Sequence, residues 1–256
     1  MPHAKAVVMP VEHLSAMIFG TDGVVTDTAR IHAAAWKRTF DEFLRVRARR
    51  DSGRFEPFDM RADYLRYVDG RPRLEGVRTF LGARGITLPE EAPGDDPGAT
   101  TPAALSDRKD RYFLEHVRHY GVAAHSSTVA LVRGLLDRGI ATATVSASRN
   151  CAAVLRAAGA ADLFDVRVDG IDVARLRLPG TPDPALLLEA AARLGVPPAR
   201  AGVVENACPG VTAARRGRFG LVVGLDPGGH TTELYRQGAD VVVTDLGDLT
   251  LPEVAG

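Results

Sequence analysis

The sequence predicts an α/β fold, a doubly wound parallel sheet with a helical cap domain inserted after the first strand. Short valine- and isoleucine-rich runs alternate with longer alanine- and arginine-rich segments that have helical spacing. Most of these runs are apolar at consecutive positions, which is typical of strands buried on both faces. The region between about Thr28 and Ala123 has helical patterns and no such run, so it is predicted to be a helical insertion.

Six apolar runs predict the strands, and four segments between them predict helices. The strands are expected at residues 16–21, 140–147, 166–170, 201–206, 220–226 and 240–246, and the helices at 126–138, 150–158, 184–194 and 208–216. Pro184 suits the first turn of a helix. Gly139, Gly159 and Gly217 fit helix ends.

The predicted domains are an α/β core of residues 1–27 and 124–256 and a helical cap of residues 28–123. Within the cap, residues 89–102 hold four prolines, two glycines and four acids with almost no large apolar side chain. Such a segment buries too little apolar surface to order itself, so a mobile loop is expected there. It is either a lid over a site or a tolerated insertion.

Composition limits the functions that this chain of 256 residues can have. Its 32 basic residues balance 32 acidic ones, so no strong field attracts nucleic acid or an anionic membrane. Cys151 and Cys208 are too few for a disulfide framework, and both have apolar neighbours that suit small buried side chains. No run reaches the roughly 18 apolar residues of a membrane span. A soluble cytoplasmic protein without nucleic-acid or membrane partners is expected.

Polar residues follow several of the predicted strands. Ligands of a doubly wound sheet bind at the carboxyl ends of its strands, so these segments are the candidate site. They read FGTDGVVTDT at residues 19–28, VSASRN at 145–150, GTPDP at 180–184 and VVENA at 203–207.

In this order and spacing, the four segments resemble the motifs of the haloacid dehalogenase superfamily, specifically its beta-phosphoglucomutase-like branch. The resemblance covers nearly the whole chain and includes Ala35-Trp36 and the late strand at 239–245. The family motifs are D-x-D-G-V, a serine or threonine, G-K-P-x-P and E-D. The resemblance implies a Rossmannoid core with a cap, a magnesium ion, a covalent aspartyl phosphate and a phosphorylated sugar as substrate.

The sequence departs from these motifs at three positions. Gly20 stands where the family has its nucleophilic aspartate, Thr181 where it has a phosphate-binding lysine, and Asn206 where it has a magnesium-ligating aspartate. Three family residues remain, by resemblance. They are Asp22 as general acid/base, Ser146 as phosphate donor, and Glu205.

These departures have physical consequences. Glycine has no side-chain oxygen that could form an acyl phosphate. In a well-studied hydrolase, losing the nucleophile lowers the rate by about 10⁶-fold. Magnesium prefers anionic oxygens, so a site made of Asp22, Glu205 and Asn206 is predicted to bind it weakly or not at all. Thr181 cannot neutralise phosphate charge as a lysine does.

By resemblance, Thr28 and His32 lie at the hinge between core and cap. His32 is either a hinge hydrogen-bonding residue or a structural polar side chain. Arg73 matches a cap arginine that grips a sugar-linked phosphate, although Arg71 and Arg73 could equally be solvated loop charges.

By the same resemblance, Arg149 and Asn150 help to hold a second phosphate. Asn150 could equally cap the next helix. Glu205 is either an anchor behind the site or a strand-end acid satisfied by backbone donors.

Other polar residues near the first strand do not readily replace the nucleophile. The Thr21 hydroxyl should point away from the site, because successive strand side chains face opposite sides. Asp27 is more typical of a turn or cap. With two acids and no lysine or magnesium, the site repels an anion unless Arg73 and Arg149 close over it or Asp22 is protonated.

The sequence therefore predicts a catalytically degenerate protein of this branch that binds a phosphorylated sugar, senses a ligand or contacts a protein partner. The alternative is an active phosphatase or phosphomutase that acts on sugar phosphates by a non-standard route.

Overall fold

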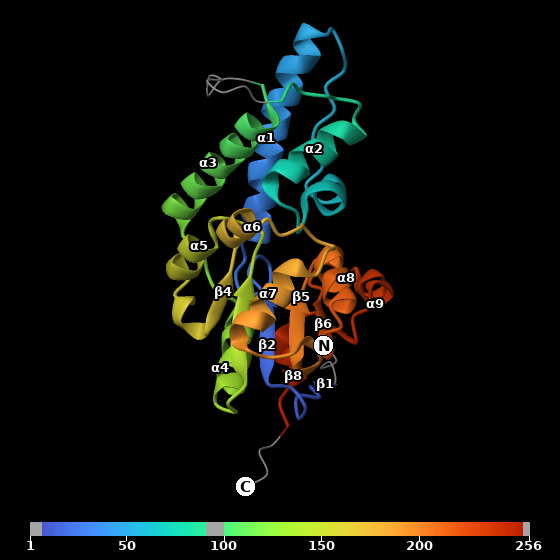
Figure 1. The fold of residues 1–256 in the computed structure, drawn as a ribbon. Coiled ribbons are helices and arrows are strands. Elements are labelled where there is room, and N and C mark those ends of the chain that lie inside the picture. The colour runs from blue at the N-terminus through green and yellow to red at the C-terminus, as the bar shows by residue number, and fades with distance from the viewer. Residues whose placement is uncertain (1–6, 91–99, 253–256) are drawn as a thin grey trace, which may run out of the picture. The chain divides into compact units, whose positions relative to one another are not determined.

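The computed structural model describes residues 7–90 and 100–252 of the chain. The chain divides into two compact units. The core unit comprises the residues up to Asp27 and those from Val122 onward, and the inserted unit is Thr28–Gly121. Figure 1 shows the ribbon of both units.

The core unit contains a six-stranded parallel sheet with strand order β4-β3-β2-β5-β6-β7. The strands are β2 (Ala16–Gly20), β3 (Ala141–Val145), β4 (Val166–Val168), β5 (Ala201–Glu205), β6 (Leu221–Leu225) and β7 (Val241–Val243). Helices connect them, which confirms the predicted doubly wound α/β fold. The predicted strands extend one to three residues too far at some ends.

Successive residues of a strand point to opposite faces of the sheet, so each strand contributes side chains to both faces. Helices cover both of these faces. Met17 and Phe19 of β2 pack into a cluster with α4 (Ser126–Leu136) and α5 (Cys151–Ala157). Ile18 packs on the other face, in a cluster with α7 (Ala185–Leu194), α8 (Cys208–Arg216) and α9 (Thr231–Gln237). These three side chains are fully buried, and each stabilises the fold by about 1.5–3 kcal/mol.

The three glycines predicted at helix ends do not all have the same backbone conformation. Gly139 and Gly159 have φ of 70° and 64°, the left-handed conformation that glycine adopts without strain. Gly217 ends α8 with φ of −72°, and the left-handed residue is Arg218. A Cβ at Gly217 would lie 2.7 Å from the Phe219 ring, so close packing rather than backbone conformation requires glycine there.

Several elements of the core unit were not predicted. β1 (Val7–Val8) pairs in parallel with β8 (Leu249–Thr250) outside the main sheet. The predicted strand 166–170 is wrong at its end, because Asp169 caps a helix, α6 (Gly170–Leu176), by accepting a 2.8 Å hydrogen bond from the Ile171 N–H. Short 3₁₀ turns lie at Ala161–Leu163, Pro198–Arg200 and Leu246–Asp248.

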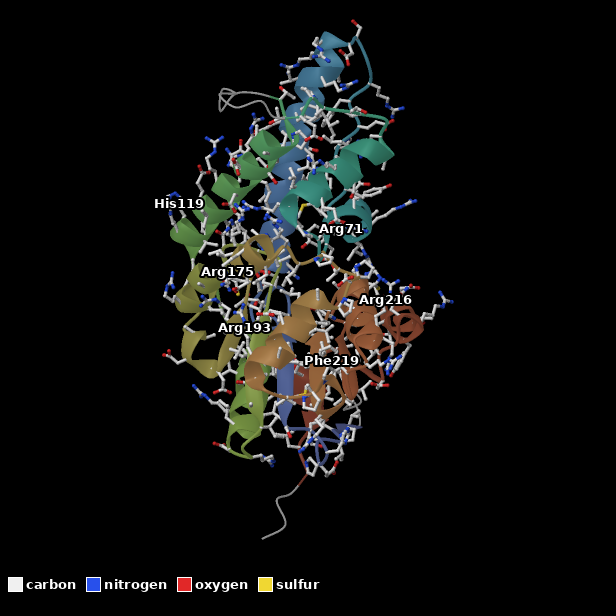
Figure 2. The ribbon with its side chains drawn as sticks, viewed as in Figure 1. Arg71, His119, Arg175, Arg193, Arg216 and Phe219 are labelled. Atoms are coloured by element: carbon white, nitrogen blue, oxygen red, sulfur yellow. The ribbon has the colours of Figure 1, made fainter. Side chains whose placement is uncertain are left out.

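Asp172 of α6 ties this helix to α7. It lies 2.9 Å from Arg175 and 2.8 Å from Arg193, and both arginines are labelled in Figure 2. These bonds hold the pKa of Asp172 at about 2, with the hydrogen bond from Arg193 as the main cause. The ion pairs therefore fix α6 beside the edge of the sheet.

The inserted unit is helical in its described part. It contains α1 (Ala29–Arg50), a π-helical turn (Tyr64–Val68), α2 (Arg73–Ala83) and α3 (Pro102–Tyr120). Its core is aromatic: the Phe40 ring centroid lies 4.2 Å from that of Phe80 and 5.2 Å from that of Phe58. None of the helices among the described residues is long and apolar enough to cross a membrane.

The predicted loop at 89–102 lies partly outside the described residues, which omit 91–99. Its predicted end is wrong. Thr101 is buried and accepts a 3.2 Å hydrogen bond from the Ala104 N–H, so it caps α3, which begins at Pro102. A threonine cap followed by proline is a common helix start.

Candidate functional site

The candidate site lies at the carboxyl ends of the central strands of the core unit. Gly20 ends β2 and is in register with Val145 of β3, so Ser146 follows at the same edge. On the other side of β2, Phe19 is in register with Val204 of β5, which places Glu205 at this edge too. The fold thus brings together three positions far apart in sequence.

Asp22 and Ser146 are in direct contact. The Ser146 hydroxyl donates a 2.7 Å hydrogen bond to Oδ2 of Asp22 and accepts one of 3.0 Å from the Ser148 N–H. The backbone donor fixes the direction of the serine oxygen, and the serine in turn orients the carboxylate. The structure therefore places these two predicted site residues side by side.

Glu205 fills the space beside Gly20. A Cβ built at Gly20 would lie 3.2 Å from Cδ, Oε1 and Oε2 of Glu205. On its other side the same carboxyl group packs against Gly210, where a Cβ would lie 2.5 Å from Glu205 Cδ. The Asn206 N–H donates a 3.2 Å hydrogen bond to Oε2. Two glycines thus make room for one carboxylate.

Thr21 points into the core, as strand alternation predicts. Its hydroxyl lies 2.8 Å from the Thr144 hydroxyl and 3.2 Å from the Cys151 sulfur, and it donates to the Val145 carbonyl at 3.0 Å. Cys151 is buried, and burial raises the pKa of its thiol to about 12. Cys208 is only partly buried, contrary to the expectation that both cysteines are buried.

The remaining predicted core residues lie in loops. Arg149 is exposed in the loop after β3. Asn150 occupies the N-cap position of α5, as one of the two interpretations expects, but its side chain makes no capping hydrogen bond. Thr181 lies in the loop between α6 and α7, where Asp183 accepts a 2.9 Å bond from the Ala185 N–H.

The donor set does not fit a magnesium site of the family kind. Among residues 7–90 and 100–252, no three or more histidines, cysteines, aspartates or glutamates are grouped to hold a metal. Asp22 accepts from Ser146, and Glu205 lies between Gly20 and Gly210. Asn206 offers an uncharged amide oxygen, whereas magnesium is bound mainly through carboxylates.

In the inserted unit, His32 pairs with a residue that the sequence analysis missed. Lys109 Nζ lies 2.6 Å from Nδ1 of His32, and both side chains are buried. The His32 ring stacks on Phe113 at 4.1 Å. Lys109 gave no signal, because a lysine on a helix is usually exposed. Thr28 precedes α1 without a side-chain cap bond.

Arg73 is paired with an acid of its own unit. Its Nη1 lies 2.7 Å from Oδ1 of Asp110, at ion-pair distance but not aligned for a hydrogen bond. Arg71 pairs with Glu75 at 2.7 Å. Neither arginine is a fully solvated loop charge, since Arg73 is 16% and Arg71 25% exposed.

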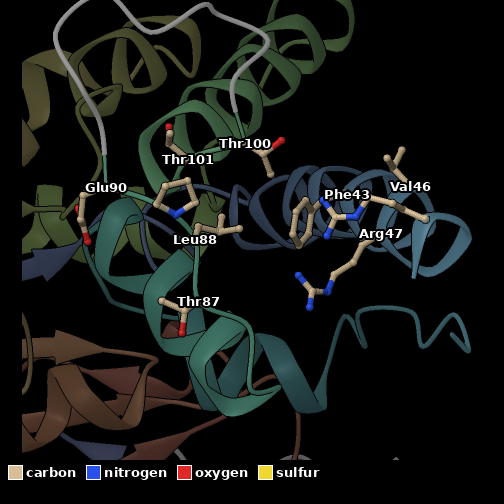
Figure 3. Close-up of a pocket in the computed structure, with 10 residues that line it drawn as sticks. Phe43, Val46, Arg47, Thr87, Leu88, Glu90, Thr100 and Thr101 are labelled. Atoms are coloured by element: carbon tan, nitrogen blue, oxygen red, sulfur yellow. The ribbon is translucent and has the colours of Figure 1, made fainter. Parts of the chain in front are cut away.

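A pocket of about 560 Å³ lies in the inserted unit, and its lining includes none of the predicted site residues (Figure 3). Its lining residues are Phe43, Val46, Arg47, Arg50, Thr87, Leu88, Pro89, Glu90, Thr100 and Thr101. Arg47 and Arg50 lie 3.3 Å and 2.9 Å from Asp51. A single carboxylate thus faces two guanidinium groups and offsets only one of their two charges.

Comparison with known proteins identifies relatives of this architecture. The family model described as haloacid dehalogenase-like hydrolase matches residues 14–218. A beta-phosphoglucomutase of Mycobacterium bovis is 42% identical over 242 residues, covering 93% of this chain and 92% of the relative. A trehalose-phosphate phosphatase of Mycobacterium leprae is 43% identical over 127 residues, covering 48% of this chain and 28% of the relative.

Among solved structures, a beta-phosphoglucomutase from Clostridium difficile superposes with a TM-score of 0.71. It is 23% identical and covers 93% of each chain, so it supports the fold alone.

Proposed function

The chain belongs to the haloacid dehalogenase-like hydrolase family, and we propose that it binds phosphorylated sugars without the covalent phosphoryl transfer that its resemblance to the family implies. The observation that carries this proposal is at Gly20. The position has no side chain, and the carboxyl group beside it belongs to Glu205 and is enclosed by Gly20 and Gly210.

The sugar-phosphate part of the proposal is supported by the relatives. Their names include beta-phosphoglucomutase and trehalose-phosphate phosphatase, and the first of these covers nearly the whole chain at 42% identity. Fold alone does not fix function, so the residues of the site must decide whether chemistry accompanies binding.

The residues of the core unit support binding more than catalysis. Ser146 and Asp22 form an oriented pair that can hydrogen-bond a sugar hydroxyl. Thr181 supplies no positive charge to offset a phosphoryl group in the transition state. In the family's chemistry magnesium would offset phosphate charge, but the described residues at these strand ends do not form a donor set that fits it.

An active enzyme is the second candidate, and the names of the relatives favour it more directly than they favour a binding protein. The Asp22–Ser146 hydrogen bond is the specific observation for it. Asp22 could accept a proton from a water molecule that attacks phosphorus while the bond from phosphorus to the sugar oxygen breaks, and then return that proton to the departing sugar oxygen, since a carboxylate within hydrogen-bond reach can act as a general base and then as a general acid.

Phosphate release from a panel of hexose phosphates, with and without magnesium, distinguishes the two. The original protein is compared with Gly20→Asp alone and with Gly20→Asp combined with Thr181→Lys and Asn206→Asp. Activity only in the restored triple variant supports a binding protein. Turnover by the original protein that Asp22→Ala abolishes would establish the active enzyme instead.

A further inference from the structure

The pocket of the inserted unit has the size of a small-molecule site. Its volume of about 560 Å³ lies within the roughly 300–1,000 Å³ that is typical of ligand pockets. Three segments that are far apart in sequence line it: α1, the residues after α2 and the residues at the start of α3 (Figure 3). All three belong to the inserted unit, so this unit forms the pocket by itself.

α1 contributes two apolar and two basic side chains to this pocket. Phe43, Val46, Arg47 and Arg50 occupy positions i, i+3, i+4 and i+7, which is the spacing of one helix face. Phe43 is buried, whereas Val46 is 67% exposed. Leu88 adds an apolar side chain from the segment after α2. Val46 therefore offers apolar surface that a ligand can cover.

The charged groups of the pocket favour an anion. Arg47 and Arg50 lie 3.3 Å and 2.9 Å from Asp51, and both contacts are made through Nε. Glu90, which also lines the pocket, lies 2.7 Å from Arg78. Among the described residues, these ion pairs join three guanidinium groups to two carboxylates, an excess of one positive charge. The Nη1 and Nη2 nitrogens of an arginine can bind both oxygens of a further carboxylate.

Helix stability alone does not account for this arrangement. Arg47, Arg49 and Arg50 all lie in the last turn of α1, where positive side chains interact favourably with the helix dipole. Arg49 is exposed and follows Arg47 by two residues, which places it on the other side of the helix. The dipole favours all three arginines, but it gives no reason for two of them to share a face with Phe43 and Val46.

We propose that this pocket is a second ligand site of the protein and that it binds a small aromatic carboxylate. Phe43 and Val46 contact the ring of the ligand, and Arg47 and Arg50 bind its carboxylate group. An aromatic ring fits better than an aliphatic chain, because guanidinium groups stack on aromatic faces as well as binding carboxylates. Binding of a sugar phosphate by the core unit is not required for this role.

Titrations of the full chain with phenylacetate, followed by NMR, test this site. Phenylacetamide is the matched ligand without the charge, and acetate is the matched ligand without the ring. We expect phenylacetate to bind at least about tenfold more tightly than either, because the arginines bind the charge and the apolar side chains bind the ring. Binding of the amide as tightly as the acid would overturn the proposal, and so would the absence of phenylacetate binding.

Two arginine substitutions locate the bound carboxylate. Arg47→Met keeps an apolar side chain of similar length and removes the guanidinium group, so it should weaken phenylacetate binding by about fivefold or more. Arg49→Met is the matched control, because it removes the same charge from the other side of the same helix turn. Its affinity should stay within about twofold of the original, since solvent screens a distant exposed charge. An equal loss in both variants would reflect net charge alone and overturn the proposal.

Val46→Glu tests the same face through an exposed position that substitution does not unfold. The new carboxylate should weaken phenylacetate binding by about tenfold or more, because it repels the ligand at short range. Val46→Gln is the control of similar shape without the charge, and it should weaken binding less. Circular dichroism and thermal unfolding establish that each variant is folded. An affinity of Val46→Glu equal to that of the original protein would overturn the proposal.

Discussion

The hydroxyl of Ser146 donates a 2.7 Å hydrogen bond to the carboxylate of Asp22, joining the loop after β3 to the loop after β2. The same oxygen accepts from the Ser148 N–H, so it links a carboxylate to the backbone of its own loop. Hydrogen bonds to charged groups contribute more than neutral ones. This one sets the direction of the acid that both functional candidates use.

Ser146→Ala should lower the free energy of unfolding by about 1–2 kcal/mol, because it removes one hydrogen bond to a charged group and leaves the Ser148 N–H without its acceptor. Urea denaturation measures the change. Ser148→Ala is the control, since the Ser148 hydroxyl accepts a 3.2 Å hydrogen bond from the uncharged Asn150 N–H. Its removal should lower the free energy of unfolding by less. An effect of Ser148→Ala equal to that of Ser146→Ala would contradict the assigned role.

Gly210→Ala should destabilise the protein by about 1–3 kcal/mol, because the added methyl would lie 2.5 Å from Cδ of Glu205 in a packed site. Combining it with Glu205→Ala should recover much of the loss, since neighbouring residues are energetically coupled. Gly82→Ala is the control: its Cβ meets no atom within 4 Å, and alanine should stabilise the exposed helix position by about 0.5–1 kcal/mol. Additive effects of Gly210→Ala and Glu205→Ala would argue against the contact.

Asp172→Asn should lower the free energy of unfolding at pH 7 by about 1–2 kcal/mol, because the carboxylate pairs with Arg193 and Arg175 and its pKa is lowered to about 2. The folded pKa lies below the unfolded value, so this stability is present above about pH 4 and is lost as the pH falls toward 2. Unfolding curves of both proteins between pH 7 and pH 2 should therefore converge. A difference that stays constant with pH would indicate that the charge is not its cause.

Thiol labelling of the native protein should modify Cys208 and spare Cys151. Cys151 is 1% exposed, and burial raises the pKa of its thiol to about 12, so almost no reactive thiolate is present at pH 8. Mass spectrometry after a timed reaction with iodoacetamide locates the label, and unfolding in urea should make both cysteines reactive. Fast native labelling of Cys151 would show that α5 opens locally.

The strands of the main sheet could be predicted because most of them are buried on both faces and are rich in apolar residues at consecutive positions. Met17, Ile18 and Phe19 show this directly, since successive residues enter different helix-covered clusters. β1 and β8 could not, because two residues carry no periodicity. The end of β4 was predicted wrongly because Asp169 caps α6. A pattern of apolar residues does not reveal such a side-chain cap.

The members of the site could be named from motif order, but their contacts could not. Ser146 and Asp22 were expected at one edge of the sheet, and parallel strand register brings them there. The placement of Glu205 depends on two glycines in other elements, and the pairing of His32 depends on a lysine of α3. Such contacts are set by packing between elements, and sequence spacing does not contain them.

Arg73 provides the sharpest test of ligand binding by the inserted unit, because its charge is already opposed by Asp110 at 2.7 Å. If Arg73 grips the phosphate of a sugar phosphate, Asp110→Asn should increase the affinity for glucose 6-phosphate by about threefold to tenfold, since a partly buried competing anion is removed. Arg73→Met should weaken binding by at least as much. The control is Glu75→Gln. This variant also removes one negative charge, but Glu75 lies on α2 and pairs with Arg71 rather than with Arg73. Calorimetry on all four proteins distinguishes ligand binding by Arg73 from a purely structural ion pair. If the Asp110→Asn protein loses stability without gaining affinity, the Arg73–Asp110 pair only joins α2 to α3.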